Sequence, residues 1–236
     1  IAISFGDSAL ERKVFAISVS DLSLNIGDFV TIEGNVSFAG NATESVFAGN
    51  ELEVFLGQGP ARLESGEINP LATGVLLTDA TIGMIRLGDK YAMNARGTVR
   101  VLGIDGVTLS GTAIIRFNNT QQAIDRILTI GGADEDVVVR FDTTADVASF
   151  QAIDLDISLL GQSLRGDFAF QQTTTADGGF AILVGATNVS LSLGDGSSDL
   201  VSVTDGQGAF LLTNAGFAGE VSATVNVDLP GVDFGG

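Results

Sequence analysis

The sequence predicts an all-β protein, made mostly of antiparallel strands in a sandwich or a curved sheet. Apolar and polar residues alternate with a period of two in several segments, most clearly at residues 30–38, 189–193 and 221–229. Gly-Asp, Asp-Gly and Pro-Gly pairs separate these segments and are typical of tight turns. Such alternation places one face of a strand against a core and the other in water.

The expected strands run along the whole chain. We count roughly sixteen candidate strands, with the clearest alternation at 30–38, 107–117, 163–170, 189–193 and 221–229. Residues 121–128 alone have a spacing that suggests a helical turn. The alternation predicts a buried row of large apolar side chains, namely Val30, Ile32, Phe38, Leu109, Phe117, Leu164, Phe168 and Phe170.

The chain also repeats itself. Residues 50–59 resemble 187–196, residues 15–34 resemble 150–166, and residues 98–107 resemble 224–232, at offsets that drift from 137 to 125. The sequence therefore predicts two tandem copies of a repeat of roughly 135 residues: a first β-repeat at 1–136 and a second, incomplete one at 137–236. The second copy stops at Gly236, the match of Gly111, so we expect an excerpt of a longer array or completion by adjacent copies, with end-to-end association.

Three glycines interrupt the apolar rows. Gly34, Gly111 and Gly166 each precede an alternating strand that ends in phenylalanine. A glycine inside a strand costs stability, so it needs a local reason. The expected reason is a bend in the strand or the close approach of a neighbour, with a ligand against the backbone as the alternative.

Composition excludes several functions. There are 29 acidic against 11 basic residues, a net charge of −18, and no cysteine or histidine. The chain therefore has no disulfide, no Cys/His zinc site, and no Ser-His-Asp or Cys-His catalytic group. The negative charge disfavours nucleic acid as a partner. The apolar runs are shorter than the roughly 18 to 20 residues of a transmembrane helix, so we expect no transmembrane segment.

Two acidic segments are candidate calcium sites. Their residues are Asp134, Glu135, Asp136, Asp195 and Asp199. Calcium prefers several carboxylate and carbonyl oxygens, but the position where an EF-hand loop needs glutamate is Gly206 here. The alternative for both segments is a solvated acidic turn or linker. Calcium is the one cofactor considered, and the sequence predicts no catalytic or other cofactor-binding residue.

A family resemblance rests on two segments, Val-Thr-Leu-Ser-Gly-Thr-Ala-Ile-Ile-Arg-Phe-Asn-Asn-Thr (107–120) and Asn-Val-Ser-Leu-Ser-Leu-Gly (188–194). In style and motif spacing the whole chain resembles the tandem β-rich repeats of very large bacterial secreted or surface proteins, which are often adhesin-like. The resemblance implies an extracellular or cell-surface location and a structural or adhesive role. It supplies no catalytic residue.

We therefore expect a non-enzymatic module of a longer extracellular bacterial protein, acting as a spacer, filament or adhesion unit. Its expected partners are adjacent copies or repeats of the same protein, with surface glycans and calcium as further ligands. The alternative is a curved sheet that binds lipid or another apolar ligand, like the groove of AsmA-like lipid-transfer proteins. A third alternative is a glycan-active enzyme that uses Asp and Glu. The structural module predicts a closed dry core, and the lipid binder predicts an open apolar groove.

Overall fold

The computed structural model describes residues 15–26, 29–131, 135–175, 178–194 and 198–228, which form thirteen strands and no helix. The prediction of an all-β protein is confirmed, whereas the helical turn expected at 121–128 is wrong because this segment contains strand β7. The strands are β1 (Phe15–Ile26), β2 (Val30–Gly40), β3 (Glu44–Gln58), β4 (Thr73–Leu87), β5 (Lys90–Leu102), β6 (Val107–Asn118), β7 (Ile124–Leu128), β8 (Val137–Phe141), β9 (Val147–Leu159), β10 (Gln162–Thr174), β11 (Phe180–Gly194), β12 (Asp199–Thr213) and β13 (Gly216–Val227).

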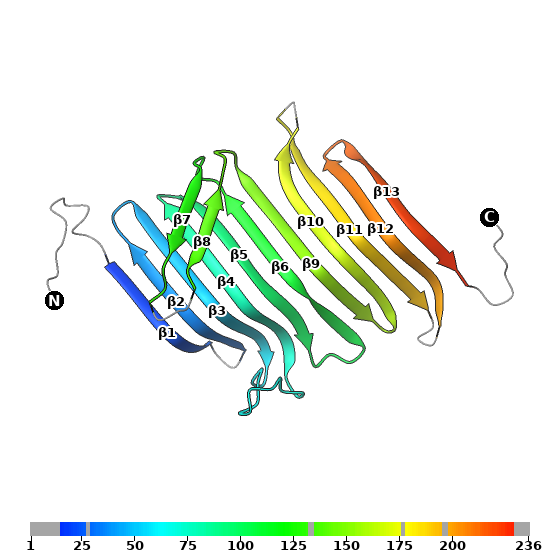
Figure 1. The fold of residues 1–236 in the computed structure, drawn as a ribbon, viewed down its shortest axis with the longest axis horizontal. Coiled ribbons are helices and arrows are strands. Elements are labelled where there is room, and N and C mark those ends of the chain that lie inside the picture. The colour runs from blue at the N-terminus through cyan, green and yellow to red at the C-terminus, as the bar shows by residue number, and fades with distance from the viewer. Residues whose placement is uncertain (1–14, 27–28, 132–134, 176–177, 195–197, 229–236) are drawn as a thin grey trace. The chain divides into compact units, whose positions relative to one another are not determined.

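Eleven of these strands belong to one large sheet, in the order β1-β2-β3-β4-β5-β6-β9-β10-β11-β12-β13, and β7 pairs with β8 in a small second sheet (Figure 1). The registered pairs are antiparallel, as the sequence predicts. Contacts divide the chain into two compact units, which we describe separately. Unit 1 comprises the described residues within 15–54, 77–97 and 115–147, and unit 2 comprises those within 55–76, 98–114 and 148–228.

Bulges restart the apolar alternation within the long strands. In β9, the apolar side chains stand at Phe150 and Ala152 and then at Leu155 and Ile157, so the pattern changes from even to odd positions. The register shifts at the same place, beside Asp154, which has a φ of 52°. Side chains change face at every residue of a strand, so one extra residue returns the second half of β9 to the face of the first.

The same device recurs in other strands of both units. Non-glycine residues with φ close to +50° lie at Asp21 in β1, Glu51 in β3, Asp79 in β4, Asp154 in β9, Asn188 in β11 and Asp205 in β12. Asn and Asp tolerate this left-handed conformation better than most residues do. Acidic and amide residues inside these strands therefore have a structural use that is separate from solubility.

The glycines of the apolar rows lie beside these bulges. Gly34 has a φ of +131°, and a Cβ there would approach Glu51 O to 2.6 Å. Gly166 has a φ of +152°, and its Cβ would lie 3.2 Å from Thr187 O, next to the bulge at Asn188. The local reason for glycine is therefore the close backbone of the neighbouring strand, one of the explanations that the sequence offered.

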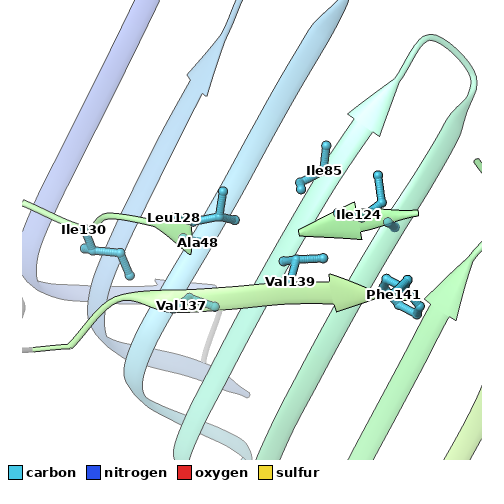
Figure 2. Packing of buried hydrophobic residues seen from close by; sticks show 9 residues of the cluster. Ala48, Ile85, Ile124, Leu128, Ile130, Val137, Val139 and Phe141 are labelled. Atoms are coloured by element: carbon cyan, nitrogen blue, oxygen red, sulfur yellow. The ribbon is translucent and has the colours of Figure 1, made fainter. Parts of the chain in front are cut away.

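Unit 1 contains the larger apolar cluster. The hairpin of β7 and β8 crosses over strands of the large sheet and buries its apolar side chains against them (Figure 2). The buried residues are Ala48, Ile85, Ala92, Ile124, Leu128, Ile130, Val137, Val139 and Phe141. The expected apolar alternation holds in β8, where every second residue is buried. Burial of this hairpin supplies the main apolar stabilisation of unit 1.

Polar contacts fix the position of the hairpin. Arg126 makes a two-pronged ion pair with Glu44, at 2.7 Å and 3.3 Å. Asn50 Nδ2 donates to Glu135 O at 3.0 Å. Ser20 Oγ, on the side of β1 opposite Val19, donates to Gly131 O at 3.0 Å. These contacts place the hairpin segment on the polar face of β1 and β3, so the apolar row of β1 points away from it.

Unit 2 has a smaller buried cluster, made by Phe55, Ala72 and Leu76. Ala61, Ile68 and Leu102 pack against it, and Asn69 ties the intervening loop down through a 2.8 Å bond to Pro60 O. None of these residues lies in β9 to β13. The strands at the end of the sheet therefore do not share in this core.

The predicted buried row is wrong in its degree of burial. Phe38 and Phe170 are 39% and 41% exposed, and the other members of the row are only half-buried: Val30, Ile32, Leu109, Phe117, Leu164 and Phe168. Within each unit, alternation correctly groups these residues on one face of their strands. A sandwich would cover that face with a second large sheet, and the described residues form none.

Candidate functional site

The candidate site is one face of strands β9 to β13 in unit 2, which we call the apolar face. It is defined by the row Leu164, Phe168 and Phe170 of β10 and by the residues registered with that row on the neighbouring strands. Phe170 stands opposite Phe150 and Val184, and Val184 stands opposite Phe210. The rings of Phe150 and Phe170 lie 6.2 Å apart. Cross-strand pairing thus gathers aromatic and branched side chains into one surface.

The apolar face is exposed to solvent. It includes most of the exposed large apolar side chains described in β9 to β13, namely Phe150, Leu159, Phe170, Phe180, Leu193, Leu212, Phe217, Val221 and Val225. Phe217 and Val221 are 78% and 73% exposed, because β13 is the last strand of the sheet. Scattered exposed apolar residues are normal, but a contiguous apolar surface of this kind is a candidate site for an apolar partner.

The opposite face of the same strands is polar. In β10 it carries Ser163, Arg165, Asp167 and Gln171, and Arg165 pairs with Asp156 at 3.0 Å. Its one exposed large apolar side chain among the described strand residues is Leu183 of β11. The contrast between the faces agrees with the period of two in the sequence.

Asp167 is the centre of a polar contact on this face. Its Oδ1 accepts a 2.8 Å hydrogen bond from the backbone N–H of Asp154, and its Oδ2 accepts a 2.7 Å bond from Nδ2 of Asn188. Asp154 and Asn188 are the bulge residues of the two flanking strands. The backbone hydrogen bond, followed by that from Asn188, lowers the pKa of Asp167, since both favour the charged carboxylate.

Unit 1 contains a closely similar contact around Asn35. Asn35 Oδ1 accepts from the backbone N–H of Asp21 at 3.1 Å, and Asn35 Nδ2 donates to Glu51 Oε2 at 2.7 Å. Asp21 and Glu51 are again the bulge residues of the flanking strands. An acid and an amide have exchanged places relative to unit 2. Both oxygens of Asp167 and one oxygen of Glu51 accept these hydrogen bonds, so the contacts tie the bulges to the neighbouring strands.

The acidic calcium candidates are distributed over both units. Asp134 and Asp195 lie outside the described residues. Glu135 and Asp136 directly precede β8 in unit 1, and the backbone O of Glu135 is bonded to Asn50. Asp199 begins β12 in unit 2 and accepts a short hydrogen bond from Ser192 Oγ. Over the described ranges, no three Asp or Glu side chains come together as metal ligands, so calcium binding stays a prediction.

Sequence reasoning missed the use of the polar bulge residues. Their signal is a break in alternation at an Asp, Glu or Asn, as at 152–155, where two polar-face positions follow one another.

The part of the chain that the structure describes contains no helix long and apolar enough to cross a bilayer.

The chain was compared with protein families, curated proteins and solved structures. No family model matches it, and neither does any curated protein or solved structure.

Proposed function

We propose that this protein is a non-enzymatic binder of apolar ligands, and that the acyl chains of lipids lie along the apolar face of β9 to β13. The observation that carries the proposal is the exposed row of phenylalanine, leucine and valine side chains on that face. An open apolar surface is what the sequence-based alternative of a lipid-binding sheet required, whereas a structural module predicted a closed core. AsmA-like grooves are the nearest functional analogy.

The chemistry of the surface favours acyl chains over a polar ligand. Burial of apolar area contributes roughly 25 cal/mol per Å², so the phenylalanine and valine rows favour a partner that covers them. The residues that define the face include no charged side chain. With a net charge of −18, the protein repels anionic headgroups, so uncharged and zwitterionic lipids are the expected class.

Binding of phosphatidylcholine with a fluorescent acyl chain tests the proposal. The double variant Phe217→Asp/Val221→Asp places charges on exposed apolar-face positions of β13 and should weaken binding at least about tenfold, which is about 1.4 kcal/mol. The matched control Ser222→Asp/Thr224→Asp adds the same charges to the polar face of the same strand. Equal affinities of the two variants would overturn the proposal.

A second candidate function is a structural or adhesive repeat of a longer extracellular or cell-surface protein. It is favoured by the recurrence of the bulges: Asp21 and Asp154 are 133 residues apart, Glu51 and Asn188 are 137 apart, and Asp79 and Asp205 are 126 apart. These spacings follow the offsets seen in the sequence. Strands at the ends of a sheet expose backbone groups that pair with other strands. Adjacent copies and surface glycans are the partners that this function needs.

Light scattering over a concentration series tests the structural candidate. End-to-end association of copies should raise the mean mass with concentration, because the edges of β1 and β13 have no neighbour among the described strands. Proline at two alternate positions of β13 whose N–H groups point away from β12, Gly219→Pro and Val221→Pro, should reduce this association. A constant monomer mass at all concentrations would count against it.

A further inference from the structure

In unit 1 the hairpin of β7 and β8 packs on a small patch of the polar face. Each residue of this patch lies a fixed number of residues from the bulge in its own strand. In β3, Val46 and Ala48 lie five and three residues before the bulge residue Glu51. In β4, Gly83 and Ile85 lie four and six residues after the bulge residue Asp79. A Cβ on Gly83 would lie 2.5 Å from Val139 Cγ2, so β8 lies directly over this position.

Unit 2 contains the same patch at the same distances from its bulges. Leu183 and Gly185 lie five and three residues before Asn188, and Ala209 and Leu211 lie four and six residues after Asp205. Gly185 pairs with Ala209, and Leu183 pairs with Leu211. These four residues, with Ala218 opposite Leu211, are the hairpin footprint of unit 2.

The two patches have the same chemistry. In each unit, the four residues counted from the bulges are two larger aliphatic residues, one alanine and one glycine, although the alanine and the glycine have exchanged strands. In the position of Asn50, which donates to Glu135 O in unit 1, unit 2 has Thr187, also a hydrogen-bond donor. An aliphatic patch within a polar face needs an explanation, because alternation would place polar residues there.

The two patches differ in how far they are shielded from solvent. Ala48 and Ile85 are 2% and 1% exposed beneath the hairpin, whereas Leu183 is 44% exposed. Ala209 and Ala218 are also exposed, and a Cβ on Gly185 would meet nothing within 4 Å. In unit 1, Val137 and Val139 cover the patch. Among the described residues, none covers the corresponding patch of unit 2.

We propose that the hairpin footprint of unit 2 is a docking site for a second aliphatic β-hairpin of the β7–β8 kind, supplied by a further repeat of this sequence. The evidence is the occupied counterpart in the same chain, which shows both the shape of the occupant and its side chains. The occupant presents alternating Val, Ile and Leu residues to the footprint. This site lies on the opposite face from the proposed lipid surface and does not depend on it.

The test extends the full chain by a second copy of residues 112–146 after Gly236, since Val232–Gly236 matches Val107–Gly111 and Thr112 follows next. Tethering gives the added hairpin a high effective concentration. The chain has no cysteine, so Ala209→Cys introduces a single thiol in the footprint. Its labelling by a maleimide reagent should slow at least about tenfold in the extended protein relative to the unextended one.

Two controls make the outcome decisive. Phe210→Cys places the thiol on the apolar face of the same strand, and the added hairpin should leave its labelling unchanged, whereas lipid should slow it. An added hairpin with aspartate at the position equivalent to Val139 should give no protection to Ala209→Cys. Unchanged labelling of Ala209→Cys, or equal protection by the aspartate version, would overturn the proposal.

Discussion

Asn188 donates a hydrogen bond from its Nδ2 to Oδ2 of Asp167, 2.7 Å away on the adjacent strand β10. In unit 1 the corresponding bond runs in the opposite direction between the strands, from the amide of Asn35 on β2 to the carboxylate of Glu51 on β3. In both units an amide meets a carboxylate beside a bulge. Complementarity, and not the identity of either residue, is therefore what each position requires.

This relationship predicts the result of exchanging the groups in unit 2. Asn188→Asp should destabilise the protein by about 1 kcal/mol at neutral pH, because two carboxylates then face each other. The double variant Asp167→Asn/Asn188→Asp should recover at least half of that loss, since it reproduces the arrangement of Asn35 and Glu51. Urea unfolding measures the four corners of the cycle. If the contact contributes nothing to the free energy of unfolding, the double variant will recover none of the stability lost by Asn188→Asp.

Acid should weaken the same contact. The pKa of Asp167 is lowered in the folded protein below its ordinary value of 3.8, so the stability that this group contributes is complete above the unfolded pKa. It is lost as the pH falls through the lower, folded pKa. Asp167→Asn removes this titration. Between about pH 5 and about pH 2.5, the wild type should therefore lose more unfolding free energy than the variant. Parallel pH curves would contradict the assignment.

Glycine at position 34 should be irreplaceable. Gly34→Ala introduces a Cβ 2.6 Å from Glu51 O at a φ of +131°, and should cost about 3 kcal/mol. The matched control is Gly185→Ala, where a Cβ meets nothing within 4 Å, and the change should stay within about 0.5 kcal/mol. Thermal unfolding of both variants provides the comparison. Similar losses for the two would show that glycine is needed for another reason.

Calcium binding remains a separate prediction. If the acidic residues near 134–136 hold the ion, millimolar calcium chloride should raise the melting temperature by RT ln(1 + [L]/Kd), beyond the effect of sodium chloride at matched ionic strength. The variant Glu135→Gln/Asp136→Asn should lose the additional rise. Equal effects of both salts would identify these acids as a solvated acidic surface.

Strand positions could be predicted from the sequence because a period of two is a direct consequence of strand geometry. The same rule correctly places Phe38 with the apolar residues of its strands in unit 1, and Phe170 with those of its strands in unit 2. It cannot say whether a second layer covers that face, since an uncovered row and a buried row have the same alternation. This is why the predicted burial of these residues is wrong.

The hairpin and the bulge contacts were harder to predict. Ile124 and Leu128 are four residues apart, a spacing that fits a helix turn as well as a short strand whose ends are buried. Asp167 and Asn188 are 21 residues apart and meet only through strand pairing. A carboxylate at such a position looks like any other acidic residue in a chain with 29 of them. The pairing register, which sequence patterns specify weakly at bulges, decides its role.

The bulges make the length of a strand as important as its composition. Deleting Asp156, beyond the bulge, would leave every apolar side chain of β9 in the sequence, yet it would turn Ile157 and Leu159 to the polar face. Deleting Asp154 would instead remove the extra residue, so Leu155, Ile157 and Leu159 would follow Phe150 and Ala152 in one regular alternation. In this protein a one-residue deletion in a regular part of a strand is a reversal of faces, whereas a one-residue deletion in a surface turn only shortens a connection.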